Sequence, residues 1–219
     1  MKPEIILALD VGSLGQAKYF VNKLYPKIRI FKVGLQLYTA VGPKVIQMIH
    51  KKGAQVFLDL KFLDIPNTVS KAVRESLRHK VKMLTLHISG GEEMLKAAVF
   101  AAKDEAKKLK IKKPLLIGVT VLTSQKAHPG RVLNLAKIGI SSGLDGVVCS
   151  AQEARNLKNK IKRRFVIVTP GIRPKGAGKN DQKRTATELG ALKAGSNFLV
   201  IGRPILEAKD PLKAVQALV

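Results

Sequence analysis

The sequence predicts an α/β fold in which eight strands alternate with helices and close into a (β/α)8 TIM barrel. Short apolar runs of strand length recur along the chain, and each precedes a longer segment of helical character. An open, doubly wound sheet is the alternative, but residues 10–15 read Asp-Val-Gly-Ser-Leu-Gly and lack its Gly-x-Gly-x-x-Gly pattern. No linker divides the chain, so we expect residues 1–219 to form one barrel domain.

The expected strands are short apolar runs, and Pro114 opens the fifth of them. They lie at Ile5–Leu9, Ile28–Val33, Ala54–Leu58, Met83–Leu86, Leu115–Val119, Gly146–Cys149, Phe165–Val168 and Phe198–Ile201. The segments between them predict helices, of which the fourth is rich in Ala, Lys and Glu. They lie near 14–25, 37–52, 66–80, 92–109, 126–142, 151–161 and 185–195, with a closing helix from Pro204.

Composition predicts an aliphatic core in a reducing compartment. Hydrophobic residues make up 46% of the 219 residues, aromatic residues only 5%, and Trp is absent. The single cysteine, Cys149, excludes an internal disulfide. No secretory signal pattern and no apolar stretch of membrane-spanning length is visible, so we expect a cytoplasmic protein without a membrane partner.

The formal net charge of +25, from 40 Lys and Arg against 15 Asp and Glu, favours anionic partners. Nucleic acid and a phosphorylated small molecule are the two candidates. The basic residues are spread over several predicted helices, and no zinc-finger, RNA-binding or basic-zipper pattern accompanies them. We therefore expect no specific nucleic-acid partner.

Residues 56–68 form the stretch around which the chain is organised. An apolar strand runs into Asp59 and Lys61, which point to the same side because successive strand side chains alternate. Asp64 follows in the loop, and Pro66 fits the first turn of a helix. Charged groups at the end of a buried strand need a shared polar pocket or a mutual ion pair. A functional site and a structural ion pair both remain open at this point.

Polar residues also follow the other predicted strands. In a parallel barrel the carboxyl ends of the strands meet at one mouth, where chemistry takes place. The residues expected there are Asp10, Lys32, Asp59, Lys61, His87, Thr123, Ser124, Pro170, Gly171, Arg173, Gly202 and Arg203. Two lysines and two aspartates at neighbouring strand ends form an alternating-charge site, which is hard to explain by stability alone.

The last two loops predict a phosphate site. Barrels often bind phosphate after strands seven and eight, where Gly202 lets backbone approach an anion and Arg203 supplies a planar charged fork. Residues 173–184 are rich in Arg, Lys and Gly, and they predict a basic loop that closes over an anionic ligand. A solvated basic surface loop is the alternative.

These residues resemble the orotidine 5′-monophosphate decarboxylase family from end to end. The pattern Asp59-x-Lys61-x-x-Asp64-Ile65-Pro66-x-Thr68 carries the resemblance. Supporting pieces are Leu9-Asp10, Phe31-Lys32-Val33-Gly34, Leu122-Thr123-Ser124, Thr169-Pro170-Gly171-Ile172-Arg173, Asp181-Gln182-x-Arg184 and Ile201-Gly202-Arg203-Pro204. Asp-x-Lys-x-x-Asp alone is shared with related sugar-phosphate decarboxylases and aldolases.

The resemblance implies a lyase of pyrimidine biosynthesis that converts orotidine 5′-monophosphate to uridine 5′-monophosphate (UMP) without a metal or other cofactor. It implies catalytic roles for Lys32, Asp59, Lys61 and Asp64, with Lys61 as proton donor. It also implies a homodimer in which Asp64 of one subunit completes the active site of the other. The alternative is a magnesium-dependent ketose-phosphate decarboxylase or aldolase of the same superfamily.

The resemblance also assigns the substrate contacts. Asp10 and Thr68 would bind the ribose hydroxyls, near Lys32. Thr123 and Ser124 would lie at the pyrimidine end. Gln182, Arg203 and the Gly202 amide would hold the phosphate, and Arg173 would order the loop. Ile65 and Pro170 complete the expected substrate-binding set, and no metal ligand is expected because no His, Cys and carboxylate cluster has the necessary spacing.

Overall fold

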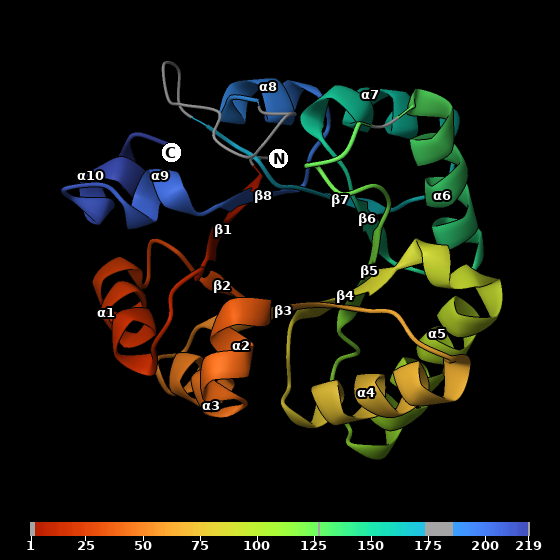
Figure 1. Cartoon of the computed structure of the whole chain (residues 1–219), viewed down its shortest axis with the longest axis horizontal. Helices are drawn as coiled ribbons and strands as arrows, with labels where there is room; N and C mark the ends of the chain where they lie inside the picture. The colour runs from red at the N-terminus through yellow and green to blue at the C-terminus, as the bar shows by residue number, and fades with distance from the viewer. Residues whose placement is uncertain (1–2, 127, 174–185, 219) are drawn as a thin grey trace.

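The computed structural model describes residues 3–126, 128–173 and 186–218, and it confirms the predicted barrel. Parallel strands pair in chain order, and β1 pairs with β8 to close the ring. The strands are β1 (Glu4–Ala8), β2 (Ile30–Gly34), β3 (Gln55–Phe62), β4 (Met83–His87), β5 (Leu115–Val119), β6 (Gly146–Val148), β7 (Val166–Thr169) and β8 (Phe198–Ile201). Figure 1 shows these strands around the centre and the helices outside them.

The helices connect successive strands and cover the barrel. They are α1 (Leu14–Leu24), α2 (Leu35–Val41), α3 (Lys44–Lys51), α4 (Pro66–Arg78), α5 (Gly91–Lys108), α6 (Pro129–Ser141), α7 (Ala151–Lys160), α8 (Glu188–Lys193), α9 (Arg203–Leu206) and α10 (Pro211–Gln216), with a 3-10 turn η1 (Ile88–Gly90) before α5. Local sequence determines where several of the helices begin. The Ser13 side chain accepts a hydrogen bond from the Gln16 amide, and Pro66 occupies the first turn of α4.

The predicted helix at 37–52 is wrong, because it is two helices, and the predicted closing helix from Pro204 is followed by a second helix that was not separated from it. The segment 37–52 divides into α2 and α3 at Gly42, whose φ of +67° favours glycine, and Pro43 follows it. The closing helix from Pro204 ends at Leu206, and Asp210 then starts α10 by accepting from the amides of Leu212 and Lys213. Both breaks carry a local signal, Gly42-Pro43 and Asp210-Pro211, which the coarse helix prediction did not use.

The core has two apolar layers. Alternate residues of the strands fill the barrel interior with a small cluster, to which Ile6, Phe57, Met83 and Ile117 belong. The residues between them, such as Leu7, point outward and form a larger cluster with the buried faces of the helices. Both faces of each strand are therefore apolar, as expected for a parallel sheet covered by helices.

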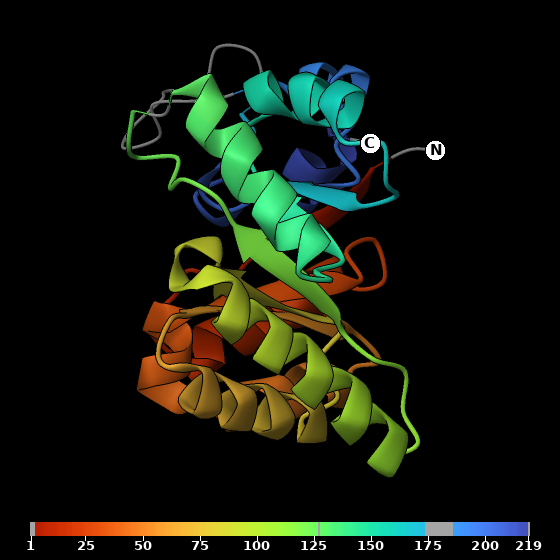
Figure 2. The same cartoon turned by 90° about the vertical axis from the view of Figure 1, so that its right-hand side faces the viewer.

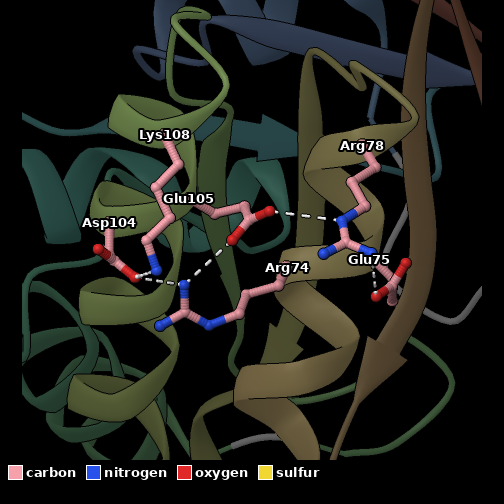
Figure 3. A network of polar contacts seen from close by, with 6 residues as sticks. All are labelled: Arg74, Glu75, Arg78, Asp104, Glu105 and Lys108. Atoms are coloured by element: carbon pink, nitrogen blue, oxygen red, sulfur yellow. Dashed lines mark hydrogen bonds and ion pairs between the residues drawn. The ribbon is translucent and has the colours of Figure 1, made fainter.

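An ion-pair network joins α4 to α5 (Figure 3). Glu105 of α5 is buried, and its carboxylate accepts from Arg74 Nη1 at 3.2 Å and from Arg78 Nε at 3.4 Å. Arg74 also pairs with Asp104. Exposed pairs surround these contacts and involve Lys108 with Asp104 and Glu75 with Arg78. Because α4 starts just after β3, this network fixes the helix that follows the charged stretch; Figure 2 shows α4 and α5 side by side.

We expect Glu105→Gln to lower the melting temperature by several degrees, because two guanidinium groups lose their shared buried carboxylate. Glu75→Gln is the matched control, since it removes one exposed ion pair of Arg78 and exposed pairs contribute little. Thermal unfolding followed by circular dichroism measures both. Equal shifts in the two variants would contradict the assignment of Glu105 as the centre of the network.

Candidate active site

A cavity of about 220 Å³ opens at the carboxyl ends of the barrel strands. Side chains from the barrel interior form most of its apolar part, and Val121 and Leu122 extend it; the interior residues are Ala8, Phe57, Val119, Val148, Val168 and Val200. The polar part brings together most of the predicted site residues: Asp10, Lys32, Asp59, Lys61, Thr123, Pro170, Gly171, Arg173, Gly202 and Arg203. The fold therefore assembles one cavity from residues that are up to 195 positions apart in the sequence, Ala8 and Arg203.

Four charged side chains form a continuous chain along one wall. Lys32 Nζ lies 3.1 Å from Asp10 Oδ1 and 3.4 Å from Asp59 Oδ2. Lys61 Nζ lies 2.9 Å from the same Asp59 oxygen. Lys32 and Asp59 are buried, whereas Asp10 is exposed and Lys61 is partly exposed. The most accessible ammonium group, that of Lys61, is thus held at the cavity by a buried carboxylate.

The two buried members of the chain stabilise each other's charged forms. Burial by itself would raise the pKa of Asp59, but the positive charges of Lys32 and Lys61 outweigh it and hold the pKa below its ordinary value. Burial would likewise lower the pKa of Lys32, and the charges of Asp59 and Asp10 hold it above its ordinary value. Both groups therefore stay ionised at neutral pH.

His87 is the last residue of β4 and lies close to the row of four charged side chains. Burial, followed by the positive charge of Lys61, lowers its pKa from the ordinary value, so the imidazole is neutral at pH 7. His87 does not line the cavity. The structure therefore places His87 near Asp59 and Lys61 but outside the cavity lining.

Gly34 follows Lys32 on β2, and the sequence pattern alone did not give it a role. A Cβ atom at position 34 would lie 2.9 Å from Lys32 Nζ and 3.6 Å from Asp10 Oδ1. Any side chain here would therefore displace the ammonium group of Lys32. The absence of a side chain at residue 34 makes room for the Asp10–Lys32 ion pair.

The backbone at Lys61 departs from a regular strand. Its φ is +53°, in the left-handed region, and the pairing of β3 with β4 shifts register between Leu58 and Phe62. Simple alternation predicts Asp59 and Lys61 on one side, and both do face the cavity. The contact is nevertheless made through this local irregularity, which the sequence does not reveal.

The predicted phosphate side is formed by the ends of β7 and β8. Arg173 is buried, its Nη1 donates to the Ile172 carbonyl at 3.0 Å, and its amide donates to the Ala186 carbonyl at 2.9 Å. Arg203 begins α9 and lines the same cavity. Two guanidinium groups therefore lie at the end of the cavity that the sequence assigns to phosphate. Gln182 and most of the predicted basic loop, 174–184, lie outside the described residues.

Besides His87, four predicted residues in the described part of the chain do not line the cavity: Asp64, Ile65, Thr68 and Ser124. All four are exposed. Asp64 Oδ1 accepts from the Ile65 amide at 2.7 Å just before α4. In the part of the chain that the structure describes, no group of three or more His, Cys, Asp or Glu residues is placed to hold a metal ion. No described helix has the length and apolarity needed to cross a membrane.

Comparisons with known proteins point to one family. The model of the Orotidine 5'-phosphate decarboxylase / HUMPS family matches residues 3–218. Orotidine 5'-phosphate decarboxylase of Coxiella burnetii (strain RSA 331 / Henzerling II) is 45% identical over 99% of this chain and 95% of the relative. That of Vibrio vulnificus (strain YJ016) is 46% identical over 98% and 96%. The crystal structure of orotidine 5'-phosphate decarboxylase from Lactobacillus acidophilus is 35% identical, with a TM-score of 0.86 over 100% of this chain and 97% of that chain.

The lowered pKa of Asp59 predicts a pH-dependent contribution to stability. Its carboxylate stabilises the fold above the unfolded-state pKa of about 3.9, and the contribution is lost as the pH falls through the lower folded-state pKa. We therefore expect Asp59→Asn to lower the free energy of unfolding most at neutral pH, and the gap from wild type to shrink below about pH 4. Urea unfolding at a series of pH values measures the gap. A gap that stays constant down to pH 2 would contradict the prediction.

Proposed function

Because the chain belongs to the Orotidine 5'-phosphate decarboxylase / HUMPS family, we propose that it decarboxylates orotidine 5′-monophosphate to UMP in pyrimidine biosynthesis. The observation that carries the proposal is the Asp10–Lys32–Asp59–Lys61 chain beside an apolar cavity with two arginines. The two relatives described above favour this reaction over the ketose-phosphate alternative, since both are named for it.

The residues of the cavity match the parts of this substrate. Arg203 would bind the phosphate with a planar charged donor, together with the Gly202 amide and Gln182, and Arg173 would order the adjacent loop. Asp10 and Lys32 would face the ribose, with Thr68 contributed by a second subunit. Thr123, with Ser124 beyond it, would lie at the pyrimidine end. Ile65 and Pro170 would complete the set of residues in contact with the substrate.

The chemistry requires the cleavage of one carbon–carbon bond. The bond between C6 of the pyrimidine and its carboxylate breaks, CO₂ leaves, and the electron pair stays on C6. Lys61, as an ammonium ion, would stabilise this carbanion and then donate the proton that forms the new C6–H bond. Asp59, 2.9 Å away, would aim the ammonium group, and solvent would return the proton to Lys61.

We further propose that the enzyme is a cytoplasmic, single-domain protein that works as a homodimer with shared active sites. Asp64 stands between Leu63 and Ile65, which are 54% and 66% exposed, and it lies outside the cavity of its own chain. A second subunit that covered these apolar side chains would bury them and could receive Asp64 beside its own Lys61. This arrangement accounts for the exposure of Asp64, Ile65 and Thr68 in one chain.

The test of the activity follows the ultraviolet absorbance of orotidine 5′-monophosphate in excess EDTA. We expect wild type to form UMP without added metal, and Lys61→Ala to lose about 10²–10⁴-fold in kcat, because the general acid is gone. Lys82→Ala, which removes a lysine at the opposite end of the barrel, is the control and should keep full activity. Folded wild type that is inactive here, but cleaves a ketose phosphate with magnesium, would overturn the proposal.

A mixing experiment tests whether the active sites are shared. Asp64→Asn and Lys61→Ala homodimers should each be nearly inactive. If Asp64 acts across the interface, subunit exchange gives heterodimers in which one of the two sites is intact, and the mixture should regain about a quarter of wild-type activity. Each variant mixed with itself is the control. Mixtures that stay inactive although subunit exchange is demonstrated would show that Asp64 acts within its own chain.

A further inference from the structure

Thr85 is a buried residue of β4 that lies behind the proposed proton donor. Its side chain is fully shielded from solvent and does not line the cavity. We propose that Thr85 is a positioning residue for Lys61, and that its hydroxyl sets both the backbone of Lys61 and the carboxylate of Asp59. This proposal rests on the proposed function, because it assigns Thr85 a part in the same protonation step.

One hydroxyl group connects the two site residues. The Lys61 amide donates to Thr85 Oγ1 at 2.9 Å, and Thr85 Oγ1 donates to Asp59 Oδ1 at 3.0 Å. A hydroxyl has one proton to give, and an ionised carboxylate can only accept. The direction of both hydrogen bonds is therefore fixed, from the Lys61 amide through Thr85 to Asp59.

The hydroxyl also replaces a partner that the sheet no longer supplies. The pairing of β3 with β4 loses its regular register between Leu58 and Phe62, the segment that contains Lys61. Lys61 has a left-handed backbone, which is uncommon for a residue other than glycine and needs support from its surroundings. The hydrogen bond from the Lys61 amide to Thr85 provides such support.

Together these contacts close a ring. The tip of Lys61 contacts Asp59 Oδ2 at 2.9 Å, while Thr85 contacts Asp59 Oδ1 and the Lys61 amide. Lys61 is thus held at both its backbone and its ammonium group, and the carboxylate of Asp59 is held through both oxygens. A proton donor must be placed accurately against the reacting carbon, so removing one side of the ring should impair proton transfer more than substrate binding.

Two substitutions separate this role from simple packing. Thr85→Val keeps the shape of the side chain but removes the hydroxyl, whereas Thr85→Ser keeps the hydroxyl and removes a methyl group. Thr120→Val is the matched control, because Thr120 is a buried threonine beside the end of β5 whose hydroxyl donates to the Val148 carbonyl at 2.8 Å. Thr120 is not part of the hydrogen-bonded ring of Asp59, Lys61 and Thr85.

We expect Thr85→Val to lower kcat by about 10- to 100-fold with a change in KM of less than about threefold, because Lys61 is displaced while the substrate contacts remain. Thr85→Ser should stay within about threefold of wild type. The acid limb of the kcat profile should move to higher pH in Thr85→Val, since the charged form of Asp59 loses a hydrogen-bond donor. Thr120→Val should retain the wild-type kcat and pH profile.

A second readout does not depend on activity. In protein labelled with ¹³C-lysine, the ε-carbon signal of Lys61, assigned with Lys61→Arg, should shift or broaden in Thr85→Val and remain in place in Thr85→Ser and Thr120→Val. Inactive wild type would overturn the proposed function, while this signal would still decide whether Thr85 positions Lys61. If Thr85→Val does not fold, Thr85→Ala takes its place with the same expectations. An unmoved Lys61 signal, or an equal loss of kcat in the serine variant, would overturn the proposal.

Discussion

The buried carboxylate of Asp59 is the group on which the site depends. A carboxylate that leaves water needs charged or hydrogen-bonding partners, and Asp59 has three: Lys32, Lys61 and Thr85. Lys32 lies on β2, Lys61 on β3 and Thr85 on β4, so the site forms only when these three strands are correctly paired. The fold and the charge arrangement therefore stabilise each other, and neither can be explained alone.

A structural ion pair and a catalytic one would both satisfy Asp59, but they would differ in their surroundings. A purely structural pair needs no cavity beside it. Here the paired Lys61 remains partly exposed at a cavity with apolar walls, and two arginines lie at the same mouth. An ammonium ion beside apolar surface is poorly screened, so its interaction with a developing carbanion would be stronger than in water. This combination favours catalysis as the reason for retaining the buried charges.

Sequence reasoning reached the barrel and most of the cavity because both follow from local patterns. Apolar runs identify the strands, and strand ends such as Lys32 and Asp59 then meet at one mouth by topology alone. The break at Gly42 has a local signal in Gly42-Pro43, but the prediction treated 37–52 as one helix. Gly34 and Thr85 carry no local signal of their roles, since the first is defined by the space that Lys32 needs and the second by a hydrogen bond between strands.

The excess positive charge of the chain and the balanced charge of the site serve different steps. Asp10, Lys32, Asp59 and Lys61 sum to zero formal charge, so the wall that would face the reacting carbon contributes no net attraction for an anion. The net charge of +25 instead creates a long-range field that favours the approach of an anionic nucleotide, and under the proposed function Arg203 at the cavity would give that attraction a fixed end point. The groups that attract the anionic nucleotide would thus differ from the groups that take part in the decarboxylation. Under the proposed function, the phosphate would be bound by groups other than the charged wall, while Asp59 would direct the ammonium group of Lys61 at the pyrimidine and would itself be unfavourable for the carboxylate that must leave.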